Sequence, residues 1–157
     1  MRRKEREVVD FSEMLDILSR CQTIRMGMKG SDFPYVVPIS FGFEVVNGQI
    51  IIYAHGAPKG LKNEYLSADN RVCVEADIFH VIEKTEMGIT TRYESIIGFG
   101  RYETVTSQEE KINGLKLMTE RYGFSDYPLE RCRGLENANV FKIVLEKITG
   151  KRNLAGI

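Results

Sequence analysis

The segment from His55 to Lys62, His-Gly-Ala-Pro-Lys-Gly-Leu-Lys, contains the residues of this sequence that are best suited to hold an anion. It lies between an apolar stretch and a short amphipathic one, so it joins the end of a strand to the start of a helix. A helix N-terminus offers unpaired N–H groups and a partial positive charge, which favour phosphate. Lys59 and Lys62 can add charge-assisted contacts. We interpret the segment as a phosphate site; a plain turn with two solvated lysines is the alternative.

A second candidate lies in the stretch Arg92–Arg101, which reads Arg-Tyr-Glu-Ser-Ile-Ile-Gly-Phe-Gly-Arg. Its residue types predict a strand that carries a hydroxyl, Ser95, and two glycines with no side-chain cover. Glycine within a strand often marks a close approach by a ligand or by another backbone. The alternative is a barrel strand that bends at Gly98 and Gly100 in order to close.

Histidine and cysteine chemistry is limited. His55 and His80 are the only histidines, and a zinc site needs more ligands than this pair provides. Cys21, Cys73 and Cys132 are far apart and form no CxxC unit, so we expect free thiols in a reducing compartment and no metal site. His80 follows a predicted strand, beside a charged loop, and is interpreted as an exposed surface residue.

Composition narrows the possible partners. The chain has 157 residues, which suits one domain over 1–157, and its 22 Lys+Arg balance its 22 Asp+Glu. A general nucleic-acid binder needs a basic excess, so that class is excluded. No apolar run reaches the ~18 residues of a membrane span. The basic start, Arg2–Arg6, precedes no apolar stretch, so we interpret it as a solvated arm of a cytoplasmic protein.

These residues are positioned by short elements. Apolar residues at helical spacing, with Asp10 or Ser12 and Thr106 or Ser107 as N-caps, predict helices over 11–20, 61–68 and 108–122. The apolar side of the last helix, which includes Leu115, Met118 and Tyr122, is interpreted as core. Alternation and β-branched residues predict strands over 21–28, 35–43, 49–54, 71–79, 92–105 and 140–148. A loop is expected over 83–90, and an irregular or helical piece over 128–135.

The connections indicate the fold class. Asn47-Gly48 predicts a tight hairpin, and the other short links also favour antiparallel pairing. Pro38 lies within a predicted strand although it cannot donate a ladder hydrogen bond, so that strand is expected at an edge, at a bulge or beside something other than a strand. We predict a mainly β (α+β) domain, a small barrel or sandwich with helices. The sequence contains neither a GxGxxG dinucleotide fingerprint nor a P-loop.

Four segments in order resemble the pyridoxamine-phosphate-oxidase-like flavin-binding split barrels. They are 1–8, 34–43, 53–62 and 93–101, and the resemblance extends to the ending Ile148-Thr-Gly-Lys-Arg152. Within that superfamily the chain looks most like the nitroimidazole-resistance (Nim-type) proteins. The resemblance implies a six-stranded antiparallel split β-barrel with Greek-key topology and flanking helices. It also implies a homodimer, with FMN, or alternatively FAD, in a cleft at the interface.

The resemblance also assigns roles to residues. The strand segment Val37-Pro38-Ile39-Ser40 would run past the isoalloxazine ring, which would explain Pro38. His55 would lie near the ring or the substrate, Tyr53 would contact the cofactor, and Lys62 would hold the phosphate. Ser95 would add a hydroxyl contact to the phosphate or the ribityl chain. Family members often carry Arg where this chain has Leu61, so part of the phosphate clamp is either missing or moved to Lys59.

The function implied is that of an FMN-dependent oxidoreductase. Hydride or electrons from a reduced nicotinamide or another donor would pass to a small flat acceptor, such as the nitro group of a 5-nitroimidazole. His55 would be the catalytic residue, because its ordinary pKa lies near neutrality and it can hydrogen-bond the acceptor or supply a proton. The alternatives are a flavin-binding carrier or sensor without turnover, and a haem-binding split barrel. No nucleic-acid or membrane partner is expected.

Overall fold

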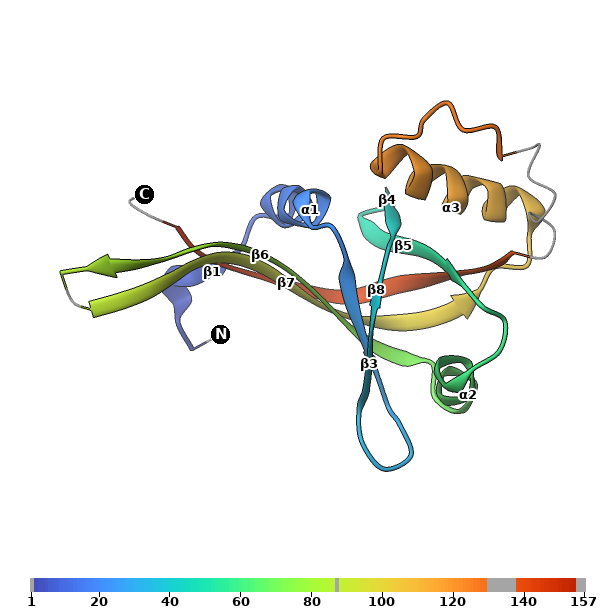
Figure 1. The fold of residues 1–157 in the computed structure, drawn as a ribbon, viewed down its shortest axis with the longest axis horizontal. Helices are drawn as coiled ribbons and strands as arrows, with labels where there is room; N and C mark the ends of the chain where they lie inside the picture. The colour runs from blue at the N-terminus through green and yellow to red at the C-terminus, as the bar shows by residue number, and fades with distance from the viewer. Residues whose placement is uncertain (1, 87, 130–137, 155–157) are drawn as a thin grey trace.

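One antiparallel sheet dominates the computed structural model, which describes residues 2–86, 88–129 and 138–154 (Figure 1). Within this part of the chain the strand order is β3-β2-β6-β7-β8-β5-β4, and β1 pairs with β8. The sheet does not close, because β3 and β4 form its two ends. The predicted antiparallel split-barrel fold is confirmed. The strands are β1 (Glu7–Val8), β2 (Ile24–Met28), β3 (Tyr35–Ile39), β4 (Gly42–Val46), β5 (Gln49–Gly56), β6 (Arg71–Thr85), β7 (Gly88–Thr104) and β8 (Asn139–Asn153).

The three predicted α-helices are present as α1 (Phe11–Arg20), α2 (Leu61–Ala68) and α3 (Gln108–Arg121), and a single 3₁₀ turn (Lys4–Arg6) precedes β1. Both predicted caps form. The Asp10 carboxylate accepts from the Ser12 backbone N–H at 2.7 Å, and the Ser107 hydroxyl accepts from the Glu110 N–H at 3.4 Å. These bonds satisfy donors that a helix start otherwise leaves unpaired.

The sheet has eight strands in the described residues, two more than the sequence predicts. The stretch predicted as one strand over 35–43 is divided at Ser40, where the chain passes from β3 at one end of the sheet to β4 at the other. The second addition is β1, whose two residues pair with Gly150 and Lys151 of β8. The edge position expected for Pro38 is confirmed, since β3 has only β2 as a neighbour.

The longest hairpin differs from expectation. The stretch predicted as a loop over 83–90 is strand on both sides of a tight turn, and Thr85 pairs with Gly88. In the outer part of the hairpin, residues 81–85 and 88–92 form strand pairs only with each other. This part projects from the body of the molecule as a two-stranded ribbon (Figure 1). Its apolar residues include Ile82 and Ile89, both of which are exposed, so this ribbon presents apolar side chains that the described part of the chain does not cover.

Two apolar layers meet at β5. Ile50, Ile52 and Ala54 point into the main core, which α1 also enters. Ile51 and Tyr53 point to the opposite face, where they pack with residues of α3. Successive strand residues face opposite sides, so α3 covers the second face of β5 (Figure 1).

The remaining expectations concern the segment 128–135, the cysteines and membrane spans. The piece expected over 128–135 lies mainly outside the described residues, as does Cys132. Cys21 is a buried free thiol and Cys73 a half-buried one. None of the described helices is both long and apolar enough to cross a membrane.

Candidate functional site

A cavity of about 360 Å³ lies where β3, β5, α2 and α3 approach one another. This size is within the range of small-molecule sites. Most of its wall consists of residues that sequence reasoning assigned to the cofactor. It is lined by Val37, Pro38, Ile39, Ser40, His55, Lys62 and Met118. The structure therefore brings together six of the nine predicted site residues. We call this cavity the Lys62 lobe.

A second cavity of about 310 Å³ adjoins the first and shares Ser40, His55 and Met118 with it. Its other walls come from α3 and the residues just after it, namely Leu115, Thr119, Tyr122 and Phe124. We call it the α3 lobe. The two lobes form one groove, and His55 lies where they meet.

Lys62 gives the first lobe its charge. Its ammonium makes no hydrogen bond or ion pair with any of the described residues, and its Nζ lies 4.6 Å from the centre of the Phe141 ring. Burial lowers the pKa of Lys62, because the charged form is partly removed from water. A Cβ at Gly56 would lie 2.8 Å from Nζ, so the glycine leaves room for the ammonium. The lobe thus contains a half-buried cation that no described carboxylate neutralises.

Ser40 and His55 provide the polar groups at the junction. His55 is exposed near the end of β5, opposite Val140 of β8, and it follows Ile51 and Tyr53 in the alternation toward α3. Ser40 lies in the link between β3 and β4. Neither side chain makes a hydrogen bond within the described part of the chain. Both are therefore free to bond to a ligand in either lobe.

Tyr53 does not line either lobe. Its side chain is buried beneath α3, and its hydroxyl lies 2.9 Å from a Glu44 carboxylate oxygen and 3.2 Å from one of Glu110. Burial first, and then these carboxylates, raise the pKa of Tyr53. Its ring also packs against Gly114 of α3. Tyr53 therefore holds α3 on the sheet in this structure.

Lys59 and Ser95 also lie outside the groove. Lys59 is exposed in the loop before α2. Ser95 faces Lys151 of β8, whereas His55 faces Val140, eleven positions away along the same strand. At ~3.3 Å per residue these positions are on the order of 30 Å apart. One chain therefore does not bring Ser95 to Lys62, and the predicted role of Ser95 needs a second copy of the chain.

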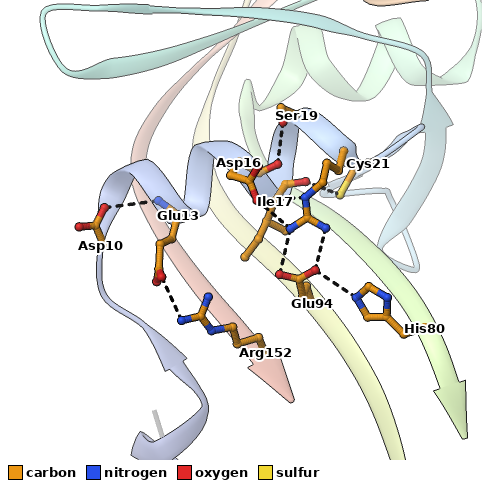
Figure 2. Close-up of polar contacts among 10 residues, drawn as sticks. Asp10, Glu13, Asp16, Ile17, Ser19, Cys21, His80, Glu94 and Arg152 are labelled. Atoms are coloured by element: carbon orange, nitrogen blue, oxygen red, sulfur yellow. Dashed lines mark hydrogen bonds and ion pairs between the residues drawn. The ribbon is translucent and has the colours of Figure 1, made fainter. Parts of the chain in front are cut away.

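His80 is exposed, as expected, but it has a partner that the sequence did not indicate (Figure 2). Its Nε2 lies 3.0 Å from Oε2 of Glu94, which is only 4% exposed. Both guanidinium ends of Arg20 donate to the same carboxylate, at 2.7 and 2.9 Å. These bonds, those from Arg20 first, lower the pKa of Glu94. Among the described residues no group of three His, Cys, Asp or Glu side chains is arranged to hold a metal ion.

Sequence reasoning missed the α3 lobe. The apolar stripe of α3 was interpreted as core, and Met118 is indeed buried, but Leu115 and Tyr122 are only half-buried and line the cavity. One signal was available. Phe124 follows the glycine that ends the helix and lies outside the helical spacing, so nothing in the pattern required it to be buried.

Comparisons with a protein-family model and with solved structures point to the same kind of protein. A family model described as "Pyridoxamine 5'-phosphate oxidase" matches residues 10–152. A proposed 5-nitroimidazole antibiotic resistance protein from Bacteroides thetaiotaomicron superposes with a TM-score of 0.78 at 25% identity, over 92% of this chain and 85% of that one. Comparison with curated proteins gives no match.

Two further solved structures share the fold. A FAD-binding protein from Mesorhizobium loti has a TM-score of 0.66 at 21% identity, over 93% of this chain and 96% of that one. The flavocytochrome Anf3 from Azotobacter vinelandii has a TM-score of 0.79 at 18% identity, over 99% of this chain and 72% of that one.

Proposed function

Because the chain belongs to the pyridoxamine 5'-phosphate oxidase family, we propose that it is an FMN-dependent oxidoreductase that reduces a small flat acceptor. The similarity to a proposed 5-nitroimidazole resistance protein supports a nitro group as the group reduced. The similar folds of a FAD-binding protein and a flavocytochrome are in keeping with a flavin-based activity.

The observation that carries the proposal is the unneutralised ammonium of Lys62 in a cavity of ligand size. A charge that is partly removed from water is unfavourable unless an opposite charge approaches it. The Lys62 lobe is therefore complementary to an anion, and a flavin phosphate fits that requirement. Charge-assisted hydrogen bonds between ammonium and phosphate are among the strong ones in proteins. The donor set thus favours a phosphorylated flavin, which we take to be FMN.

The remaining walls of the lobe suit the rest of such a cofactor. Val37, Pro38 and Ile39 belong to the edge strand β3, whose outer side has no neighbouring strand. Pro38 presents no backbone N–H, so the middle of this wall is apolar. A largely apolar wall with a polar group at its end, Ser40, is typical of sites for small-molecule ligands.

The chemistry divides between cofactor and protein. A bound flavin supplies the redox step, and the protein contributes binding, orientation and electrostatics. We assign the acceptor contact to His55, since it lines both lobes and its ring nitrogens have no hydrogen-bond partner among the described residues. Imidazole can donate a hydrogen bond or a proton near neutral pH. A reduced nicotinamide is our proposed donor, which would bind transiently.

We further propose that two copies of the chain assemble as a homodimer. A row of residues across the outer face of the sheet, Val36, Gly27, Cys73 and Phe99, is in register across β3, β2, β6 and β7. Val36 is 58% exposed and Phe99 49%, so the row leaves apolar surface uncovered. Such patches are typical of interaction sites. A second copy would also be the source of Ser95 near Lys62. Sedimentation that finds a monomer with full flavin content would contradict this assembly.

The test compares two lysine variants. Lys62→Ala removes a charge-assisted bond and should weaken FMN binding by about tenfold to a hundredfold. Lys59→Ala, in which an exposed lysine outside the groove is removed, is the matched control and should change it less than about threefold. Affinity is measured from the quenching of FMN fluorescence as the protein is added.

Riboflavin serves as the second ligand, because it lacks the phosphate. Its affinity should be the same in Lys62→Ala and in the unchanged protein. Equal FMN affinity in all three proteins would remove Lys62 from the site. Steady oxidation of a reduced nicotinamide in the presence of a 5-nitroimidazole separates an oxidoreductase from a flavin carrier, in which the flavin stays bound but no turnover occurs.

A further inference from the structure

From the α3 lobe we infer a subsite for the second ligand, one that selects uncharged aromatic molecules carrying a single polar group. This inference rests on the proposed function, since it places the acceptor beside the cofactor site. In this proposal the ligand is selected by side chains of α3 and by Phe124, which lie outside the sheet. They favour uncharged ligands over charged ones.

The walls of the lobe are apolar in the positions that a ligand can reach. None of the described residues that line it is Asp, Glu, Lys or Arg. Two of the three hydroxyls are already used by the fold. Thr119 donates to the Lys116 carbonyl at 3.0 Å, and the Tyr122 hydroxyl donates to the Gln22 carbonyl at 2.8 Å. An ion that entered this lobe would lose its hydration without gaining a counter-charge.

Among the described residues that line the lobe, the only polar side chains without a hydrogen bond are those of Ser40 and His55, and both lie at the junction with the Lys62 lobe. A ligand with one polar group would therefore direct that group toward the junction and its apolar part toward α3. This orientation follows from hydrogen-bond supply, because a buried polar group elsewhere in the lobe would stay unpaired. A ligand with polar groups at both ends is disfavoured for the same reason.

Phe124 supplies an aromatic wall, and the fold holds its backbone in place. Gly123, at φ +86°, ends α3, and the Phe124 N–H then donates to the Thr119 carbonyl at 2.8 Å. The Gly123 N–H donates to the Glu120 carbonyl at 3.0 Å, which completes a Schellman motif. The Phe124 side chain is nevertheless 59% exposed. An accessible aromatic ring whose backbone is held in this way is suited to stack on another ring.

The cavity size agrees with a small ring compound. Its volume of about 310 Å³ lies at the lower end of the range for small-molecule sites, which suits a ligand with one substituted ring. The occupant is therefore a single-ring aromatic molecule. Its polar substituent would reach His55, which is the residue we assign to the acceptor contact.

The experiment uses nitrobenzene and 4-nitrobenzoate, which share a ring and a nitro group and differ by one carboxylate. Binding is followed by the NMR shift of the Met118 methyl group in methyl-labelled protein, with and without FMN. With FMN bound in the Lys62 lobe, nitrobenzene should bind at least about tenfold more tightly than 4-nitrobenzoate to the unchanged protein, whereas without FMN the Lys62 ammonium can also attract the carboxylate. Equal affinities, or no shift of Met118 with either probe, would overturn the inference.

Three variants test the walls. Phe124→Ala should weaken nitrobenzene by about fivefold to tenfold. Phe33→Ala, which removes an aromatic ring that is 82% exposed and lies outside both lobes, is the matched control and should leave binding unchanged. Leu115→Lys places a cation in the lobe and should reverse the preference, so that 4-nitrobenzoate binds more tightly. Equal effects of Phe124→Ala and Phe33→Ala would overturn the assignment.

The readouts separate this inference from the proposed function. Each variant should retain its FMN affinity, because none of the three changes touches Lys62. If FMN fails to bind the unchanged protein while nitrobenzene still shifts Met118 and Phe124→Ala weakens that binding, the subsite stands and the FMN proposal fails, because Phe124 lines only the α3 lobe. If FMN binds and nitrobenzene does not, the subsite fails and the FMN proposal stands.

Discussion

Replacing Glu94 with Gln tests how much of the stability depends on one buried charge beneath α1. The carboxylate accepts two bonds from Arg20 and lies 3.0 Å from His80 Nε2, and its side chain is 6% exposed. Glutamine has the same shape, but its amide NH₂ would point at a guanidinium donor. The variant therefore loses the ionic attraction and at least one hydrogen bond, while the volume of the site is unchanged.

The expected loss of stability is about 2–3 kcal/mol. Removing one partner of a fully buried ion pair costs ~3–5 kcal/mol, whereas removing one from a surface pair costs ~1 kcal/mol or less. The Arg20 side chain is 40% exposed and also contacts Asp16 at 2.9 Å, so its charge stays partly compensated after the change. Because of this compensation, the expected loss of stability is smaller than for a fully buried ion pair. Because Glu94 is buried, the loss is larger than for a surface ion pair.

The assay is urea unfolding at pH 7, with protein concentration and flavin content held fixed, because both shift apparent stability. Glu146→Gln is the matched control. Glu146 accepts from Arg101 Nε at 2.7 Å, but both side chains are about half exposed. Its replacement should change the free energy of unfolding by less than ~1 kcal/mol. Equal losses in Glu94→Gln and Glu146→Gln would refute the argument from burial.

The dependence on pH supplies a second check. The folded-state pKa of Glu94 is lowered, so its contribution is fully present above the unfolded carboxyl pKa of ~4.3. The contribution is then lost as the pH falls through the folded pKa. The stability difference between the unchanged protein and Glu94→Gln should therefore shrink below about pH 4. A difference that stays constant down to pH 3 would show that the charge is not its source.

Two glycine substitutions test the groove and the seat of α3. Gly56→Ala places a Cβ 2.8 Å from the flexible end of Lys62. The affinity for FMN should therefore fall about threefold to tenfold, while the urea midpoint stays the same. An unchanged FMN affinity would show that the position of the ammonium is not important. Gly114→Ala places a Cβ 2.7 Å from the Tyr53 ring; overpacking of ~1–3 kcal/mol should exceed the ~1 kcal/mol gain in helix propensity. The same change in a Tyr53→Leu background should be neutral or stabilising, and a loss of stability there would contradict this explanation.

Local rules predicted the elements that depend on near neighbours. Asp10 and Ser107 cap their helices because the bonds reach only two or three residues along the chain. Asn47 and Gly48 both adopt positive φ and turn β4 into β5, as their residue types indicate. Pro38 marked an edge strand because its missing N–H is a property of the residue itself.

Most residues that line the groove were predicted from the resemblance to a family, whereas the extent of the groove depends on long-range packing. Tyr53 and His55 point to the same face of β5, but α3 covers Tyr53 and leaves His55 exposed. No rule of alternation states where a helix ends above a strand. Ser95 lies far from Lys62 because β7 and β8 run past the groove, which is a property of strand length and register.

The Arg20–Glu94–His80 contacts show the same limit together with a usable signal. The three residues lie on α1, β7 and β6, so no spacing in the sequence connects them. Glu94, however, alternates with the buried Ile96 on one face of β7. An acidic residue at an inward position of a strand requires a cationic partner, even though the strand pattern does not identify that partner.

The position of β8 in the sheet determines when, during synthesis, the two parts of the sheet can be joined. This strand, Asn139–Asn153, is the last in chain order, yet it lies between β7 and β5 and also pairs with β1. While the chain is being synthesised, β4 and β5 can pair only with each other, and the facing edges of β5 and β7 stay open until β8 arrives. Closing contacts of such long range fold slowly, and open edges invite association with other chains. We therefore expect the growing chain to be most prone to aggregation just before β8 emerges from the ribosome.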